Sequence, residues 1–246
     1  MTISLFHILN ISRMDMLAKM NDLDTVSANV SNSNTIGYKS NRANFQEMLE
    51  GLNYEGVHQT STQIDMRQGS VHTTGNQLDV AIQGDGFFAV SLGQGKTGYT
   101  RDGQFVLDSQ NRLVTPSGYP VVWNGTIPAD ADEIQFQPNG EVRVKVGDTW
   151  NVAGNIQLAR FANPTALQMN GNNVYIETTS SGKAALGQPG TTNFGTLMGQ
   201  TVEQSNINMA EEMTHLITLQ RGFQLSTRIF QATDTMLSQA IHVRKA

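Results

Sequence analysis

The sequence predicts an α+β fold in which paired N- and C-terminal helices, arranged like a coiled coil, flank an inserted antiparallel β-domain. Apolar residues recur at helical spacing from about Leu5 to Val30 and from Asn208 to Val243. Between them, short strand patterns alternate with turn signals. We therefore expect a terminal helical domain at 1–33 and 206–246, an extended connecting region at 34–75 and 195–205, and the β-domain at 76–194.

The first predicted helix has one apolar face. Met16, Met20, Leu23 and Val30 follow a 4, 3, 7 spacing, and no Gly or Pro interrupts the segment. The helix should end in residues 29–34, because Asn and Ser side chains compete for backbone hydrogen bonds and favour caps and turns.

The second predicted helix carries a heptad pattern. Met209, Leu216, Phe223, Phe230 and Leu237 recur every seventh residue. The helix would be roughly 50 Å long, so we expect it to extend beyond a compact domain of this size. It could cover its own domain's core, or complete its packing against the first helix and neighbouring chains. The companion heptad position is half polar, with Met213, Gln220, Thr227, Asp234 and Ile241.

The start of this helix carries a capping signal. Asn208 is followed three residues later by Glu211, which resembles a capping box.

The middle of the chain reads as a series of hairpins. Residues 93–98 should form a turn, and residues 178–193, rich in Thr, Ser and Gly, should form a loop. Strands are expected at 78–82, 87–92, 105–107, 113–114, 121–123, 133–136, 141–146 and 156–161.

Composition excludes several classes of function. Charged residues make up only 15% of the chain and the net charge is −5, so a basic face for nucleic acid is not expected. The absence of cysteine excludes disulfides and zinc–thiolate sites. No segment approaches the ~20 apolar residues of a transmembrane helix, and the first residues lack the basic region of a cleavable signal.

No catalytic, cofactor or metal site can be assembled from the sequence. Gly93 to Gly98 matches G-x-G-x-x-G, but both phosphate-binding motifs need a following helix, and a strand is expected instead. A calcium loop counted from Asp130 would place Ile134 at a ligand position. We expect a hairpin turn and a solvated acidic turn, and a protein that is not an enzyme.

Several segments resemble flagellar rod and hook proteins. Asn29 to Lys39 resembles the Asn-rich, Gly-Tyr-Lys signature that ends their first helix, and Thr74 to Phe88 resembles the opening of their β-domain. Glu203 to Met213 is similar to the distal rod member in particular. Residues 50–70 are shorter than in a distal rod protein that crosses an outer membrane, so a proximal-rod or hook-like member is the alternative. The residues in the matching motifs are Asn34, Gly37, Tyr38, Lys39, Gly84, Asp85, Gly86, Phe87, Gln220 and Arg221.

This resemblance implies a structural subunit of the basal body that assembles with its own copies into a hollow helical tube and transmits motor torque to the hook. It also implies export through the flagellar type III channel without a cleaved signal, and contacts with the export apparatus and other rod and hook proteins. A secreted β-rich adhesin or carbohydrate-binding module is the alternative of another class, although aromatic residues are only 7% of the chain. We expect subunit packing to involve Met16, Met20, Leu23, Met209, Met213, Leu216, Phe223, Phe230, Leu237 and Ile241.

Overall fold

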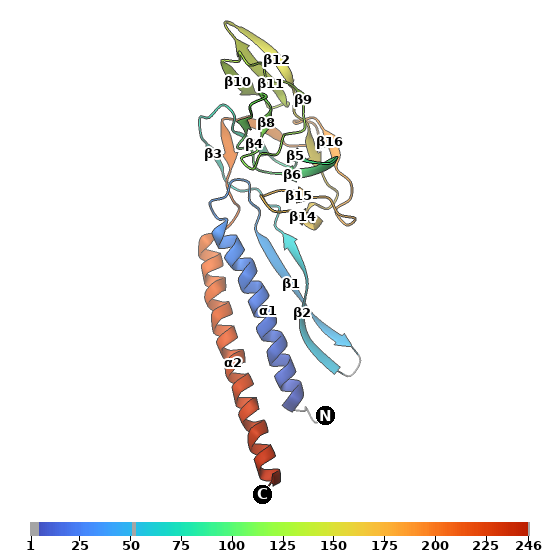
Figure 1. The fold of residues 1–246 in the computed structure, drawn as a ribbon, viewed down its shortest axis with the longest axis vertical. Coiled ribbons are helices and arrows are strands. Elements are labelled where there is room, and N and C mark those ends of the chain that lie inside the picture. Colours follow the sequence, from blue (N-terminus) through green and yellow to red (C-terminus); the bar gives the residue numbers. More distant parts are fainter. Residues whose placement is uncertain (1–4, 51–52, 246) are drawn as a thin grey trace. The chain divides into compact units, whose positions relative to one another are not determined.

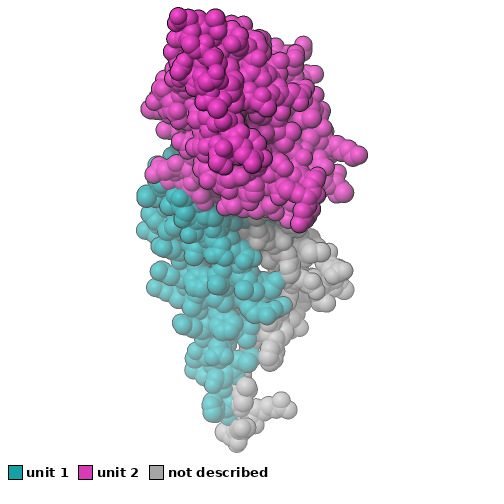
Figure 2. Space-filling model, turned by 45° about the horizontal axis from the view of Figure 1, so that its top comes forward, with its two compact units in different colours: residues 1–31, 41–63, 207–246 teal, residues 32–40, 64–206 magenta. Residues whose placement is uncertain are grey.

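Both terminal segments form helices, and the region between them is rich in antiparallel strands, which confirms the predicted α+β class (Figure 1). The computed structural model describes residues 5–50 and 53–245. These residues group into two compact units, which Figure 2 colours separately. We call residues 1–31, 41–63 and 207–246 the helical unit, and residues 32–40 and 64–206 the β unit.

The helical unit contains two long helices and a ribbon of two paired strands. The helices are α1 (Leu5–Ser31) and α2 (Met209–Lys245), and the ribbon pairs β1 (Asn41–Glu50) with β2 (Asn53–Ile64), whose last residue belongs to the β unit. The 37 residues of α2 correspond to roughly 55 Å at 1.5 Å per residue. Within the described residues, neither helix combines the length and apolar character needed to cross a bilayer.

The start of α2 is capped as its sequence predicts. The side-chain oxygen of Asn208 accepts a hydrogen bond from the backbone N–H of Ala210 at 3.2 Å, and its carbonyl accepts the N–H of Glu212 at 3.0 Å. This geometry satisfies donors that the first turn of a helix leaves unpaired.

Helices α1 and α2 lie side by side and contact each other (Figure 1). Among the side chains of α2 that the structure describes, Ser226 and Thr233 are the buried ones, and the Ser226 hydroxyl donates a hydrogen bond to the carboxylate of Asp15. Gly222 faces α1, where an added Cβ would be 2.6 Å from Cε of Lys19, near the flexible end of that side chain. Small and polar residues of α2 therefore lie against α1.

Only part of the predicted companion position of α2 contacts α1: the Thr227 hydroxyl donates a hydrogen bond to the sulfur of Met16 at 3.7 Å. The expected companion position includes Gln220 and Asp234, which are exposed. One residue corresponds to a rotation of about 100° around a helix, and close packing against α1 selects the face with the smaller residues. The more buried heptad position of α2 lies one residue before the predicted companion position, and its members are Glu212, Leu219, Ser226 and Thr233.

The β unit is built from antiparallel sheets. One has four strands in the order β10-β11-β12-β9, another has six in the order β14-β15-β6-β5-β13-β16, and the pairs β17-β4, β18-β3 and β7-β8 complete it. The strands are β3 (Val71–Thr73), β4 (Val80–Gln83), β5 (Phe87–Gly93), β6 (Lys96–Thr100), β7 (Val106–Leu107), β8 (Leu113–Val114), β9 (Asn124–Gly125), β10 (Glu133–Phe136), β11 (Glu141–Val146), β12 (Thr149–Asn155), β13 (Leu158–Arg160), β14 (Gln168–Met169), β15 (Tyr175–Ile176), β16 (Ala185–Gly187), β17 (Thr196–Gly199) and β18 (Thr201–Glu203), with one 3₁₀ turn at Pro164–Ala166.

The G-x-G-x-x-G segment is a hairpin turn, as expected. Gln94 and Gly95 both have positive φ and connect β5 to β6, so a strand follows the motif where a phosphate site would need a helix. The turn is tighter than predicted, because β6 already begins at Lys96. The strand β12 was not predicted. It forms a sheet with β11, and its apolar residues Trp150 and Val152 alternate with polar ones but are exposed, so the strand has no buried face at this end.

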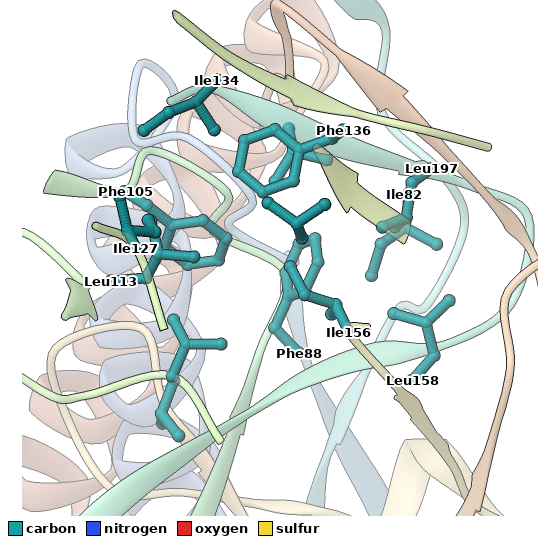
Figure 3. Close-up of a cluster of buried hydrophobic side chains, with 14 of the residues drawn as sticks. Ile82, Phe88, Phe105, Leu113, Ile127, Ile134, Phe136, Ile156, Leu158 and Leu197 are labelled. Carbon is teal, nitrogen blue, oxygen red and sulfur yellow. The ribbon is translucent and has the colours of Figure 1, made fainter. Parts of the chain in front are cut away.

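Two apolar clusters lie inside the β unit, and Figure 3 shows residues of the larger one. Phe88 and Phe105 pack edge to face with their ring centroids 5.1 Å apart, and both are almost fully buried. Side chains from different sheets belong to the same cluster, including Ile82 of β4, Val142 of β11 and Leu158 of β13. The cluster therefore holds the small sheets of this unit together.

Limited proteolysis should recover the β unit with its N-terminal segment attached. Helices depend on tertiary packing for most of their stability, so we expect proteases to cut first in α1 and α2. Tyr38 and Lys39 are buried in the β unit, so the resistant core should begin before Gly37 and end near residue 206. Mass spectrometry of the fragments measures this boundary. A core that lacks residues 37–39 would contradict the assignment of this segment to the β unit.

Candidate functional site

The Gly-Tyr-Lys motif lies in the β unit, in a segment that follows α1. Gly37 has φ of +67°, which disfavours other residues. A Cβ at this position would lie 2.5 Å from the backbone carbonyl carbon of Arg101. The N–H of Gly37 also donates to the carbonyl of Glu203 at 2.7 Å. Glycine is therefore required both by the backbone conformation and by the close approach of another segment.

Lys39 forms the centre of a buried ion cluster. Its ammonium donates to a carboxylate oxygen of Glu203 at 2.5 Å and to the carbonyl of Arg67 at 2.7 Å. The side chains of Lys39 and Glu203 are both fully buried. Burial lowers the pKa of Lys39, and the nearby Glu203 carboxylate opposes that shift.

Arg101 is the second cation of the cluster. Its guanidinium is 3.5 Å from the other oxygen of Glu203 and lies over the Phe87 ring, 5.2 Å from the centroid. Burial lowers the pKa of Arg101, against the attraction of Glu203 and Asp85. Its Nε is buried and has no hydrogen-bond partner among the described residues. Two buried cations therefore share one buried carboxylate.

Backbone contacts connect the same segments. Gly69 donates its N–H to Glu203 at 3.0 Å, and Asp65 donates its N–H to the carbonyl of Ser40 at 2.8 Å. The side chain of Asn206 accepts from the N–H of Ser40 at 2.8 Å and donates to the carbonyl of Asp65 at 2.9 Å. Residues 36–40, 64–69 and 201–206 are thus tied together. The first of these segments follows α1, and the last precedes α2.

The Gly-Asp-Gly turn positions the aromatic side chains beside this cluster. Gly84 and Gly86 have positive φ, and the Asp85 carbonyl accepts the N–H of Gly195 at 2.7 Å. Phe87 follows the turn and packs edge to face on Phe161 and Tyr175. The turn therefore has a structural role, as its sequence predicts.

The other motif residues stand apart from the ion cluster. Asn34, Gln220 and Arg221 are exposed, and the latter two lie on α2 in the helical unit.

Charge partners at a distance could not be identified from the sequence. Lys39 and Glu203 are separated by 164 positions. A signal for Glu203 does exist, because it is a carboxylate at the end of the short buried strand β18. Its pairing with Lys39 and Arg101 depends on the topology that brings the three segments together. Among the described residues, no group of three metal-binding side chains is present.

The predicted subunit-packing residues are distributed along α1 and α2. Met16, Met209, Leu216 and Leu237 are half-buried, and the side chain of Ile241 lies outside the described residues. The exposed members are Met20, Leu23, Met213, Phe223 and Phe230.

Comparison with known proteins gives a consistent result. Residues 81–144 match the family model described as flagellar hook protein FlgE/F/G D1 domain, and residues 198–243 match flagellar basal body rod FlgEFG protein C-terminal. The chain is 35% identical to flagellar basal-body rod protein FlgG of Borreliella burgdorferi, over 94% of this chain and 96% of the relative. The chain is also 34% identical to FlgG of Caulobacter vibrioides, over 93% of this chain and 96% of that relative. It is 34% identical to FlgG of Bacillus subtilis, over 91% of this chain and 93% of that relative.

Replacing Gly37 by Ala should destabilise the protein far more than replacing Gly75. Both have positive φ, but an added Cβ at Gly75 meets nothing within 4 Å. Gly75→Ala should therefore cost about 1–2 kcal/mol from backbone strain alone, and Gly37→Ala should cost at least about 2 kcal/mol more, because the clash is with backbone. Denaturant unfolding of both variants measures the difference. Equal losses would show that the close approach at Gly37 is unimportant.

Removing the Lys39 charge should be much more harmful than removing an exposed one. Lys39→Met leaves the Glu203 carboxylate buried without its closest partner, which we expect to cost about 3–5 kcal/mol. Lys145→Met is the matched control, because Lys145 forms a 3.0 Å ion pair with Glu133 that is partly exposed. Exposed pairs contribute about 0–1 kcal/mol. Similar free energies of unfolding for the two variants would contradict the central role of Lys39.

Proposed function

Because the chain belongs to the FlgG family of flagellar basal-body rod proteins, we propose that it is a structural subunit of the distal rod and packs through its terminal helices with its own copies in a helical tube. The protein is not an enzyme. Its role is mechanical: contacts between copies carry torque from the motor along the rod to the hook.

The observation that carries this proposal is the amount of apolar surface left uncovered on α1 and α2. The contact between the two helices includes small and polar residues, and many of the larger apolar side chains remain exposed. Met213, Leu225 and Met236 are 54%, 60% and 59% exposed. Soluble monomers rarely leave large contiguous apolar patches uncovered. Other exposed members are Leu17, Met20, Ile217, Phe223, Ile229 and Phe230.

Burial of these side chains between copies would stabilise the assembly. Apolar surface contributes roughly 25 cal/mol per Å² when it leaves water. Head-to-tail contacts that do not close a ring generate an open helix, and long helices with apolar faces suit such a contact. The low charged fraction of 15% keeps repulsion between copies small.

Membership of the FlgG family also supports contacts with other flagellar proteins. We propose that other rod proteins and the hook adjoin the ends of the tube, and that the subunit reaches its site through the flagellar export channel.

Introducing a charge on the apolar face of α2 should abolish assembly without unfolding the β unit. Phe223→Asp and Phe230→Asp each remove an apolar group and would bury a charge between copies. We expect the concentration needed for polymer formation to rise at least about a hundredfold, measured by sedimentation and electron microscopy of the full chain. Thermal unfolding of the β unit should not change.

The matched control is Gln224→Asp, which adds the same charge to α2 at an exposed polar position and should affect assembly much less. Normal tubes from Phe223→Asp and Phe230→Asp would contradict the proposed packing surface.

A further inference from the structure

A hollow in the β unit lies beside the ion cluster and carries excess positive charge. It has a volume of about 230 Å³ and is lined by Arg101, Arg160, Asp85, Phe87 and Phe161, among others. A second, shallower hollow continues past Asp85 and Arg160. The lining of the first hollow combines two guanidinium groups with aromatic rings, a combination suited to a carboxylate on a folded partner.

The charge of Arg101 is incompletely balanced inside the chain. Lys39 and Arg101 share the single buried carboxylate of Glu203, and the contact from Arg101 is long, at 3.5 Å. Arg101 is 5% exposed, and its Nε has no hydrogen-bond partner among the described residues. A buried charge and a buried donor without full pairing are costly. An incoming carboxylate would satisfy both.

Arg160 adds a second unpaired cation at the mouth of the hollow. Its side chain is exposed at the end of β13, and its guanidinium has no hydrogen bond or ion pair with the described residues. Asp85 is the one carboxylate of the lining, so the two arginines leave a net positive charge.

Complementary charge occurs at one end of the four-stranded sheet. Asp148 lies in the tight turn between β11 and β12, and Asp132 accepts the N–H of Gly147 in that turn at 3.1 Å. Asp130 lies two residues before Asp132. All three aspartates are exposed. Asp130 and Asp148 have no hydrogen bond or ion pair within the described part of the chain.

We propose that this acidic sheet end (Asp130, Asp132 and Asp148) of one copy docks its carboxylates into the hollow formed by Arg101 and Arg160 on the next copy. The contact joins two different surfaces of the same chain, as an open helical assembly requires. This proposal rests on the proposed self-assembly. The contact would join the β units of two copies by polar groups, in addition to the apolar packing of their helices.

A charge-swap experiment on the full chain tests this contact. Arg160→Glu should raise the concentration needed for polymer formation at least about tenfold, because like charges would then face each other. Asp148→Arg should act similarly, and the double variant should recover most of the wild-type value. Lys96→Glu is the matched control, because Lys96 is exposed and lies outside the hollow. Thermal unfolding of each monomer verifies its folding.

Cysteine cross-linking provides a second measurement. The chain contains no cysteine, so a mixture of Arg160→Cys and Asp148→Cys can form a heterodimer only through the two introduced thiols. Disulfides require Cα atoms within about 7 Å. We expect this heterodimer in assembled samples, and no heterodimer when Lys96→Cys replaces Arg160→Cys.

The outcomes separate this contact from the proposed function. Wild-type protein that forms no polymer would contradict self-assembly, and the contact with it. Polymers that form equally well with Arg160→Glu would overturn the contact alone. Loss of assembly in Arg160→Glu, without recovery in the double variant and without the cross-link, would show that the hollow binds another anion.

Discussion

The Glu203 carboxylate is the interaction on which the architecture of the β unit depends. One oxygen accepts from Lys39 and from the Gly69 N–H, the other faces Arg101, and the carbonyl of the same residue accepts the Gly37 N–H. These partners come from three different segments of the chain, because Gly37 and Lys39 share one segment and Gly69 and Arg101 lie in two others. A buried carboxylate needs such partners, because an unpaired charge away from water is very costly. The chain must therefore bring the segment after α1 and the segment before α2 to the same place.

Ion pairs outside the Glu203 cluster have a smaller structural role. Several of the other ion pairs are local, such as Arg112 with Asp108 and Arg143 with Glu141, and these are partly exposed. Local exposed pairs contribute little to stability and fix no topology. The long-range pairs of Lys39 and Arg101 with Glu203 differ because they are buried and join distant segments. The three-residue motif from Gly37 to Lys39 therefore has a structural role, because it supplies one partner of a buried, long-range ion pair.

The helical unit differs from the β unit in which side chains it buries. Several of its buried side chains are small or carry hydroxyl groups, including Ser12, Ala18 and Ser226, whereas many bulky apolar residues are exposed. A monomeric protein would place its largest side chains inside. In a protein that assembles, exposed apolar side chains can be buried against neighbouring copies. The helix pair then has a small, polar surface inside and an apolar surface for contact with other copies. The helices and the β unit thus offer different chemistry for contact, apolar along the helices and charged at the hollow.

The sequence by itself determined the class of fold, both helices and the hairpin character of the middle, because periodicity, capping by Asn208 and turn residues act over a few positions. Strands such as β10 and β11 are predictable for the same reason, because their alternating apolar residues form a buried face. In β12 the apolar residues Trp150 and Val152 also alternate, but they are exposed. The tertiary structure decided which face of α2 meets α1, because a shift of one residue rotates the contact by about 100° and the bonds of Ser226 with Asp15 and of Glu212 with Asn29 are made on this face. It also decided the partners of Lys39, since charges so far apart in sequence meet only when the β unit has folded around them.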